Sequence, residues 1–247
     1  MQEVYKNTHA FALLTPELKI KTRNTLKTWN GPSVLLIGID SVSRINMRRS
    51  LPRTYDFLNT NHWIEYKGYN KIADNTFPNV GAFLTGRNSS DLWKTCRPSR
   101  LGALDKCNFL WHDYADLGYV TAYAEDEIQF NIFSYMAAGF DDPPTDIYYK
   151  PYVLASEDLG KTTLDHMTYC SGQENSCERI LNAAKDFAVS LKEYPTFGLF
   201  WTSSCTHNNL NSASRIDDKI REFLEDITAA GVLENSIVVF LSDHGLR

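Results

Sequence analysis

The chain has 247 residues, of which 43% are hydrophobic and 22% charged, which is ordinary for a globular protein with a full core. Its net charge of -5 gives no electrostatic reason to expect a nucleic-acid partner. The sequence contains no run of about 18 consecutive apolar residues, so it predicts no membrane span in this chain.

Alternating strand and helix patterns begin at residue 34, whereas residues 1–30 lack a clear periodicity and predict an irregular lead-in. In chain order, the patterns predict a strand at 34–39, a helix near 51–60, extended chain at 63–72, helices at 77–84 and 108–117, a strand at 119–123, a helix at 178–191, a strand at 196–201, a helix at 216–230 and a strand at 237–241. Residues 139–175 are expected to form the longest irregular region, either a functional loop or a lid.

Strands separated by helices indicate a mostly parallel sheet with helices on both faces. We therefore predict an α/β fold, a three-layer α/β/α sandwich in which residues 31–247 form the core and residues 1–30 precede it. The all-apolar run at 237–241 is expected to be buried on both faces. Because the chain stops at Arg247, two residues after Gly245, we expect the core to be partial and the sheet to be incomplete at its C-terminal end.

The cysteines favour an oxidising compartment. Cys96 and Cys107 close one short loop, and Cys170 and Cys177 close another, so we favour these four cysteines as disulfide partners and leave the connectivity of the five cysteines open. The sequence lacks a CxxC pair, which argues against a thiolate zinc knuckle. Asn88 begins an N-glycosylation acceptor pattern. These features favour an extracellular or secretory-pathway location over a cytosolic one, with reduced buried thiols as the alternative.

Acidic and imidazole side chains follow several predicted strands. Asp40 follows the first strand, Asp243 and His244 follow the last, and His207 follows the strand at 196–201. Ligands of parallel α/β sheets bind beyond the carboxyl ends of the strands. A single Asp in such a place is more often a turn residue. Several acids and imidazoles at one edge, however, are costly unless a cation neutralises the charge, so the combination predicts a divalent metal site.

Thr76 directly precedes the helix predicted at 77–84, with Pro78 in its first turn. By itself this pattern predicts an N-cap residue. A hydroxyl beside the unpaired N–H groups of a helix N-terminus also suits attack on a phosphate or sulfate ester. A metal bound to that oxygen would lower its pKa. Thr76 is therefore a candidate nucleophile as well as a candidate cap.

Three consecutive acids, Glu125, Asp126 and Glu127, follow the strand at 119–123. They are possible metal ligands, but three acids in a row usually mark a solvated loop, and we expect exposure here. The sequence has no GxSxG turn, so a serine-hydrolase site is not supported.

Two motifs resemble known families. The run NTFPN at 75–79, followed by LTG at 84–86, resembles the nucleophile segment of nucleotide pyrophosphatase/phosphodiesterases. Asp40 and the run SDHG at 242–245 resemble metal-binding segments of the alkaline phosphatase and sulfatase superfamily. A narrower resemblance is to the functionally uncharacterised sulfatase-like family that is abundant in nematodes and insects, and it is carried by residues 38–44, 119–127, 143–146, 200–201 and 240–245.

The resemblance implies an alkaline-phosphatase-like core with a metal-dependent esterase site. It implies that Asp40, Thr76, Asp243 and His244 hold one divalent metal and that Thr76 is the nucleophile, which forms a covalent phospho-threonine. Mixed His and Asp ligands favour zinc. Arg44, close behind the first strand, is a candidate for substrate binding.

The sequence departs from the family pattern at a second metal site, to which the resemblance assigns His207. Ser203 stands where the phosphodiesterases have an Asp four residues before this His. The superfamily also supplies a further His from beyond the Asp-His-Gly motif, which this chain does not contain. We therefore expect one metal site and doubt the second. The sequence lacks the CxPSR context of sulfatases, and Thr76 in the nucleophile position favours phosphoryl over sulfuryl transfer.

The leading hypothesis is a metal-dependent hydrolase or phosphotransferase, a phosphodiesterase for example, acting on a small-molecule, glycan or lipid phosphate ester. Three alternatives stay open. The first is a sulfatase-like hydrolase, and the second is a catalytically inactive extracellular glycoprotein with a binding or structural role. The third is a truncated fragment that does not fold independently. The full-length protein could carry a membrane anchor outside this chain.

Overall fold

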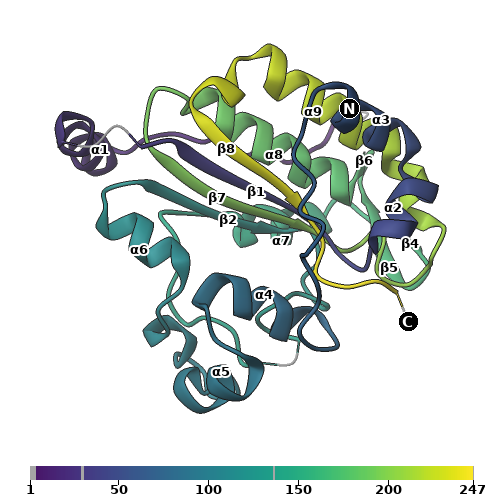
Figure 1. Cartoon of the computed structure of the whole chain (residues 1–247), viewed down its shortest axis with the longest axis horizontal. Helices are drawn as coiled ribbons and strands as arrows, with labels where there is room; N and C mark the ends of the chain where they lie inside the picture. The colour runs from purple at the N-terminus through teal and green to yellow at the C-terminus, as the bar shows by residue number, and fades with distance from the viewer. Residues whose placement is uncertain (1–3, 29–30, 136, 247) are drawn as a thin grey trace.

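The computed structural model describes residues 4–28, 31–135 and 137–246. Within these residues the centre of the molecule is a five-stranded sheet of parallel pairs, in the order β3-β2-β7-β1-β8 (Figure 1). Its strands are β1 (Ser33–Ile39), β2 (Val120–Glu125), β3 (Ile147–Tyr148), β7 (Thr196–Thr202) and β8 (Ser236–Leu241). Helices cover both faces, so the predicted three-layer α/β/α sandwich is confirmed.

Each face of the sheet carries its own group of helices (Figure 1). One face is covered by α2 (Arg44–Ser50), α3 (Pro52–Thr60), α8 (Ser176–Ser190) and α9 (Asp217–Ala229), and the other by α4 (Thr76–Thr85), α5 (Ser89–Cys96) and α6 (Leu110–Asp116). Because side chains alternate along a strand, β1 contributes to two cores. Leu35 and Ile37 pack in the core that contains α8 and α9, whereas Val34 and Leu36 pack in the core that contains α4 and α6.

A glycine allows the two central strands to stay paired up to their carboxyl ends. Gly38 of β1 lies opposite Trp201 of β7, and a Cβ at position 38 would overlap the indole ring. The backbone N–H of Asp40 then donates to the Thr202 carbonyl at 2.9 Å, one residue beyond the strand. Gly38 thus lets a large aromatic side chain pack directly beneath the point where β1 ends.

The N-terminal prediction was wrong in part. Residues 16–28 form the helix α1 (Pro16–Thr28) rather than irregular chain, and it begins with Pro in the first turn, where the missing N–H costs nothing. Its side chains lack a strong apolar face, which is why periodicity did not reveal it. The helices α2 and α5 were also not predicted. Residues 63–72, predicted as extended, form turns and irregular chain without a strand.

Residues 139–175 are not the long irregular loop that we predicted. They contain β3, α7 (Lys150–Glu157) and a small antiparallel sheet. The strands of that sheet are β4 (Lys161–Leu164), β5 (Met167–Ser171) and β6 (Glu174–Asn175). Short polar strands carry little apolar alternation, so the sequence pattern could not distinguish them from a loop.

The strand β8 is not buried on both faces as predicted. Ile237 is 52% exposed, and the remaining apolar residues of the strand are only partly buried. The strand has the apolar composition of a central strand but lies at the edge of the sheet, next to β1. Composition therefore identified the element correctly, while its position in the sheet depended on the strand order.

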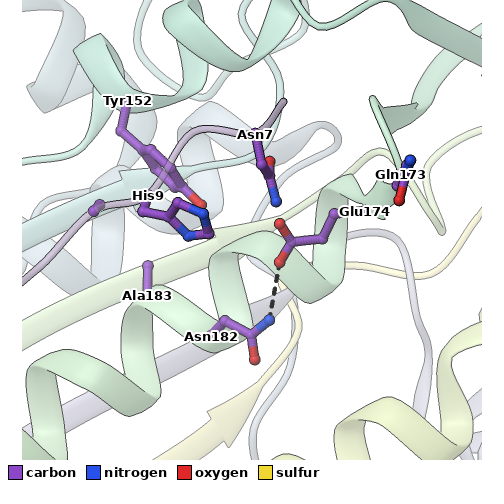
Figure 2. A pocket seen from close by; sticks show the side chains of 8 residues that line it. Asn7, His9, Tyr152, Gln173, Glu174, Asn182 and Ala183 are labelled. Atoms are coloured by element: carbon purple, nitrogen blue, oxygen red, sulfur yellow. Dashed lines mark hydrogen bonds between the residues drawn. The ribbon is translucent and has the colours of Figure 1, made fainter. Parts of the chain in front are cut away.

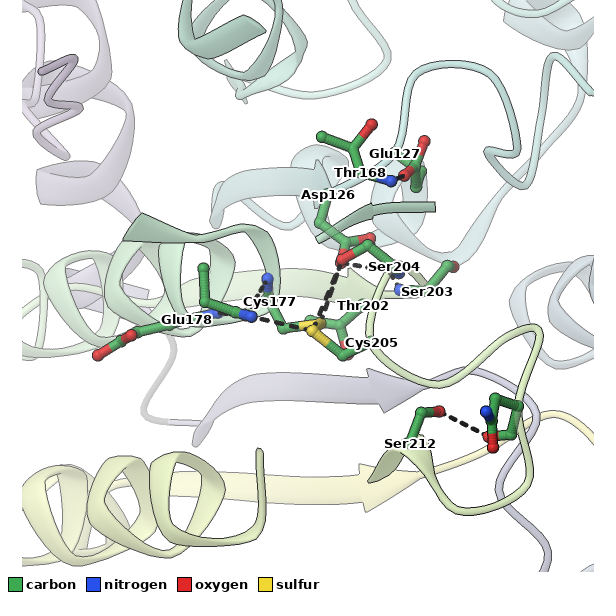
Figure 3. The surroundings of a disulfide bond; sticks show 12 residues. Asp126, Glu127, Thr168, Cys177, Glu178, Thr202, Ser203, Ser204, Cys205 and Ser212 are labelled. Atoms are coloured by element: carbon green, nitrogen blue, oxygen red, sulfur yellow. Dashed lines mark hydrogen bonds between the residues drawn. A yellow bond between two sulfur atoms is a disulfide. The ribbon is translucent and has the colours of Figure 1, made fainter. Parts of the chain in front are cut away.

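The disulfides match the prediction in one of two cases. Cys96 and Cys107 are bonded, with their Cα atoms 5.0 Å apart. Cys177 pairs with Cys205 and not with Cys170, which is free (Figure 3). The reason lies in the hairpin register, which puts Cys170 opposite Asn175. Cys177 lies in the first turn of α8 and is fully buried toward the end of β7, where Cys205 follows.

In the described part of the chain, no helix combines the length and the apolar character that a bilayer crossing requires.

Candidate metal centre

The carboxyl ends of two adjacent strands bring three predicted ligands together. The strands β1 and β8 pair in parallel, so Asp40 lies beside Asp243 and His244 although the sequence separates them by about 200 residues. One ligand atom from each of these side chains lies within 4.8 Å of the others. Asp40 and Asp243 are buried, and the His244 side chain is 10% exposed. The predicted grouping at one sheet edge is therefore present.

Thr76, the first residue of α4, contributes a fourth polar side chain to this group. Its hydroxyl donates to Asp40 Oδ1 at 3.3 Å and lies 3.4 Å from His244 Nε2. We predicted Thr76 as the N-cap, but the cap is Asn75, and Thr76 is the first residue of α4. Thr76 is therefore one position further into the helix, and its side chain faces the acids instead of capping the backbone.

The loops that follow β1 and β8 interlock. The Ser41 N–H donates to Asp243 Oδ1 at 3.2 Å, and the Val42 N–H donates to the Ser242 hydroxyl at 3.1 Å. Gly245 allows this approach, since a Cβ there would lie 2.8 Å from the Ser43 Cβ. The two acids are thus fixed relative to each other by backbone donors and not only by their own contacts.

The side chains fit a divalent cation. The imidazole Nδ1 of His244 donates to the Gly245 carbonyl at 3.0 Å, so a neutral ring turns an Nε2 lone pair toward Asp243 Oδ2, 3.2 Å away. Among the described residues, Asp243 Oδ2 is buried and has no hydrogen-bond partner. Two acceptors face each other without a donor, which a cation between them would correct.

The electrostatics agree with this fit. Burial, followed by the charge of Asp243, raises the pKa of Asp40 to about 6. Two buried carboxylates cannot both ionise cheaply without a neutralising charge. Carboxylate, imidazole and hydroxyl donors together suit zinc or a similar divalent ion.

Two other predicted site residues lie outside this group. His207 is not part of the three-residue cluster, and its ring stacks on Phe130 while Nδ1 lies 2.6 Å from Asn208 Oδ1. His207 still lies near enough for a positive charge on its ring to lower the pKa of Asp40. Arg44 is engaged elsewhere, with its Nε 3.0 Å from the Glu65 carboxylate.

The three acids at the end of β2 and directly after it, Glu125 to Glu127, do not form the solvated loop that we predicted. Asp126 and Glu127 are buried and Glu125 is half-buried. Asp126 accepts from the backbone N–H groups of Ser203 and Ser204, at 2.7 and 3.1 Å, and from the Ser204 hydroxyl (Figure 3). Ser203, which replaces the expected Asp of a second metal site, is therefore held by this acceptor through its backbone.

Glu125 and Glu127 also accept from the protein itself. Glu125 accepts from the Tyr123 hydroxyl and from the Ile132 N–H, and Glu127 accepts from the Thr168 N–H at 2.7 Å. Burial raises the pKa of Glu125 to about 8, that of Asp126 to about 6 and that of Glu127 to about 7. The sequence gave no sign of this burial, because the donors to Asp126 and Glu127 come from segments far along the chain, at Ser203, Ser204 and Thr168.

A cavity of about 330 Å³ lies elsewhere, between the N-terminal segment and α8 (Figure 2). It is lined by polar groups that include Asn7, His9, Tyr152 and Glu174. The buried Arg179 donates to the Asn7 amide and the Tyr152 hydroxyl, which ties the N-terminal segment to α8. The cavity contains none of the clustered residues, so it is not the candidate metal centre.

A parallel sheet between helical layers, with acids and an imidazole at its carboxyl edge, matches the alkaline-phosphatase-like core that the sequence resemblance implied. Comparison with solved structures agrees. The lipoteichoic acid synthase LtaP from Listeria monocytogenes superposes with a TM-score of 0.63 and 16% identity, over 88% of this chain and 57% of that one. The chain thus spans less than two thirds of this relative's length.

Two further solved structures show the same fold. Phosphonoacetate hydrolase from Sinorhizobium meliloti 1021, in complex with phosphonoformate, has a TM-score of 0.52 and 14% identity, over 87% of this chain and 56% of that one. The PsFucS1 sulfatase from Pseudoalteromonas sp. has a TM-score of 0.51 and 14% identity, over 98% and 63%. The predicted resemblance to the alkaline phosphatase and sulfatase superfamily is confirmed at the level of fold.

The chain belongs to the family described as "Protein of unknown function (DUF229)", whose model matches residues 1–247. A search of curated protein sequences produced no match.

Proposed function

We propose that this protein is a metal-dependent hydrolase or phosphotransferase of phosphate esters, with Thr76 as its nucleophile. The observation that carries the proposal is the position of the Thr76 hydroxyl, 3.3 Å from Asp40 Oδ1 and 3.4 Å from His244 Nε2. A hydroxyl that serves only as a helix cap would bond to backbone N–H groups of its own helix. Here the hydroxyl faces the acids, where a nucleophile would be activated.

Each residue has a distinct task in the proposed reaction. Asp40, Asp243 and His244 would hold the divalent ion, and Thr76 would add a fourth ligand atom. The bound ion supplies positive charge that lowers the pKa of the nucleophile and stabilises charge on the ester oxygens. The Thr76 oxygen attacks phosphorus, its proton passes to solvent, and the bond from phosphorus to the leaving alcohol breaks. Water then releases phosphate from the phospho-threonine, or a second alcohol takes the phosphoryl group.

The N-terminus of α4 supports the same chemistry. Thr76 is the first residue of a ten-residue helix whose first turn contains no acidic side chain. The free N–H groups and the positive end of the helix dipole favour the negative oxygens of an ester bound at this point. Among the candidates, a phosphate ester is favoured over a sulfate ester, because threonine cannot be converted into the aldehyde that sulfatases use.

The structures with this fold do not select a substrate. One of them is a synthase, one a phosphonoacetate hydrolase and one a sulfatase. A sulfatase-like hydrolase therefore remains the second candidate. We further propose zinc as the metal, a weaker second site near His207, a secretory or extracellular location and glycosylation at Asn88. Asn88 is exposed, and its side chain caps α5 by accepting from the Asp91 N–H. The two disulfides are consistent with that location.

The test uses the full-length protein, loaded with zinc and assayed with p-nitrophenyl phosphate, bis-p-nitrophenyl phosphate and p-nitrophenyl sulfate. Thr76→Ala should lower phosphate-ester turnover by at least about 10³-fold, because the covalent step is lost. Thr85→Ala is a matched control on the same helix, where the hydroxyl donates to the Gly81 carbonyl and accepts from the Arg87 N–H, away from the acids.

Three outcomes would contradict the proposal. Wild-type turnover in Thr76→Ala would exclude this nucleophile. Cleavage of the sulfate ester alone would favour the sulfatase candidate. A folded protein that binds no zinc at micromolar free metal and cleaves none of the esters would favour an inactive binding or structural protein.

A further inference from the structure

One buried amide organises the backbone that leads to Thr76. Asn79 is 5% exposed and lies one turn into α4. Its Oδ1 accepts from the N–H groups of Ile72 and Ala73, at 2.8 and 3.3 Å. Its Nδ2 donates to the carbonyls of Ala73 and Asn75, both at 2.8 Å. Both donors and both acceptor positions of this amide are therefore directed at the segment before the proposed nucleophile.

That segment contains a backbone conformation that side chains avoid. Asn75 has φ 71° and ψ 162°. This region is essentially restricted to glycine, and other residues remain there only when the surrounding structure holds them in place. The hydrogen bond from Asn79 Nδ2 reaches the Asn75 carbonyl, which is the group that the unusual torsion orients. This hydrogen bond from Asn79 thus opposes relaxation of Asn75.

The conformation of Asn75 decides where the next side chain points. Thr76 follows directly, and the direction in which its side chain leaves the backbone depends on the torsions of Asn75. Asn79 itself cannot shift easily, since its neighbours Pro78 and Val80 are buried and Val80 packs in the core between α4 and the sheet. The buried part of α4 therefore fixes Asn79, Asn79 fixes Asn75, and Asn75 directs the Thr76 hydroxyl toward Asp40.

We propose that Asn79 is a positioning residue for Thr76, which holds Asn75 in its strained conformation so that the hydroxyl faces Asp40 and His244. The inference rests on the proposed function for its effect on turnover, but not for its effect on backbone geometry. Asn79 touches neither the ester nor the metal ligands in this account, and it acts only through the segment 72–76.

A double-mutant cycle tests the proposal on the full-length protein with Asn79→Ala, Asn75→Gly and the double variant. Glycine adopts φ 71° without strain, so in Asn75→Gly the hydrogen bond from Asn79 should be less necessary to hold the backbone at position 75. Asn79→Ala should lower kcat at least about 10-fold with little change in KM, and it should weaken zinc binding measured by chelator competition. The double variant should recover at least about three-fold of both losses, because glycine accepts the required torsion.

Asn61→Ala is the matched control, since its amide bonds to the Phe57 carbonyl on the exposed end of α3. It should change neither kcat nor zinc affinity. If Asn79→Ala does not fold, Asn79→Asp takes its place in the cycle, because it keeps the acceptors for Ile72 and Ala73 and loses both donors. The proposal is overturned if the Asn79 variant matches the wild type, or if glycine at position 75 recovers neither kcat nor zinc affinity.

Failure of the proposed function has a different signature. If the wild-type protein cleaves no ester but binds zinc, the role of Asn79 is decided by the zinc affinities of the wild type, the two single variants and the double variant. If the wild type also binds no zinc, the proposed function fails, and the unfolding free energies of the metal-free proteins decide. Asn79→Ala should then be less destabilising in the Asn75→Gly background, and strictly additive effects would overturn the inference.

Discussion

Two groups of acids lie at the carboxyl edge of the same sheet, and they differ in the hydrogen-bond donors that the protein supplies to them. The acids after β2 accept hydrogen bonds from the protein, and Asp126 alone holds two backbone N–H groups and a hydroxyl. The acids after β1 and β8 lie beside the His244 ring and each other; they accept from the Ser41 N–H and the Thr76 hydroxyl, but Asp243 Oδ2 has no donor among the described residues. Both groups are buried, and burial raises the pKa of Asp40 and of Asp126 alike.

The difference teaches that buried acidity alone does not identify a site. A buried carboxylate that receives N–H and O–H donors is part of the protein's internal hydrogen bonding. A buried carboxylate that faces another acceptor requires a cation or a proton, which the surroundings must supply. We therefore expect substitutions of the acids after β1 and β8 to lower the metal content, and substitutions of the acids near the end of β2 to lower the stability.

Asp243→Asn should abolish the proposed metal site while leaving the fold in place. The amide keeps an oxygen for the Ser41 N–H but removes the negative charge from the position that lacks a donor. We expect a loss of turnover of at least about 10³-fold and loss of bound zinc, measured by kinetics and elemental analysis. Full zinc occupancy in this variant would mean that the two groups of acids do not differ as described.

Asp126→Ala should do the reverse, and destabilise the protein while the zinc content stays at the wild-type level. Two backbone N–H groups and one hydroxyl lose their acceptor inside the protein. We expect the free energy of unfolding to fall by about 3 kcal/mol, measured by denaturant titration. A variant with unchanged stability and no zinc would place Asp126 in the metal centre instead.

Glu125→Gln should reduce the pH dependence of stability. Burial raises the pKa of Glu125 to about 8 from its ordinary 4.5, so its neutral form favours folding. That contribution is complete below about pH 4.5 and is lost as the pH rises through 8. The variant should match the wild type near pH 5 and exceed it by about 2 kcal/mol at pH 8, because the amide stays neutral and can still pair with Tyr123 and Ile132. Parallel curves from pH 5 to 8 would assign the dependence to another group.

Cys170→Ser should have the smallest effect of the series. Cys170 is half-buried and unbonded, whereas Cys177 and Cys205 are joined beside Asp126 (Figure 3). We expect unfolding to change by less than about 0.5 kcal/mol in the oxidised protein. Cys205→Ser is the control, and it should cost about 2 to 4 kcal/mol because it removes the cross-link. A loss of about 2 to 4 kcal/mol in Cys170→Ser, with almost none in Cys205→Ser, would instead favour the Cys170–Cys177 pairing that we predicted from the sequence.

The sequence alone was enough to find the central strands and the residues at their ends. Apolar runs identify β1, β7 and β8 because burial on a sheet imposes a local pattern, and polar residues that follow such runs must lie at the sheet edge. Asp40, Asp243 and His244 could therefore be selected before the structure was known, whereas Thr76 was selected as a helix-opening residue and by its resemblance to a nucleophile segment. The same local reasoning missed α1 and the small strands β4 to β6, where no apolar periodicity exists.

Only the tertiary structure decided which of these polar residues meet. The pairing of β1 with β8 brings Asp243 to Asp40, and it also leaves β8 at the sheet edge despite its apolar sequence. The Cys177–Cys205 bond and the donors that surround Asp126 come from segments far apart along the chain. Such contacts depend on strand order and on hydrogen-bond partners that no local pattern records. The sequence determined which groups are available at the sheet edge, and the packing of distant segments determined which of them still lack a partner.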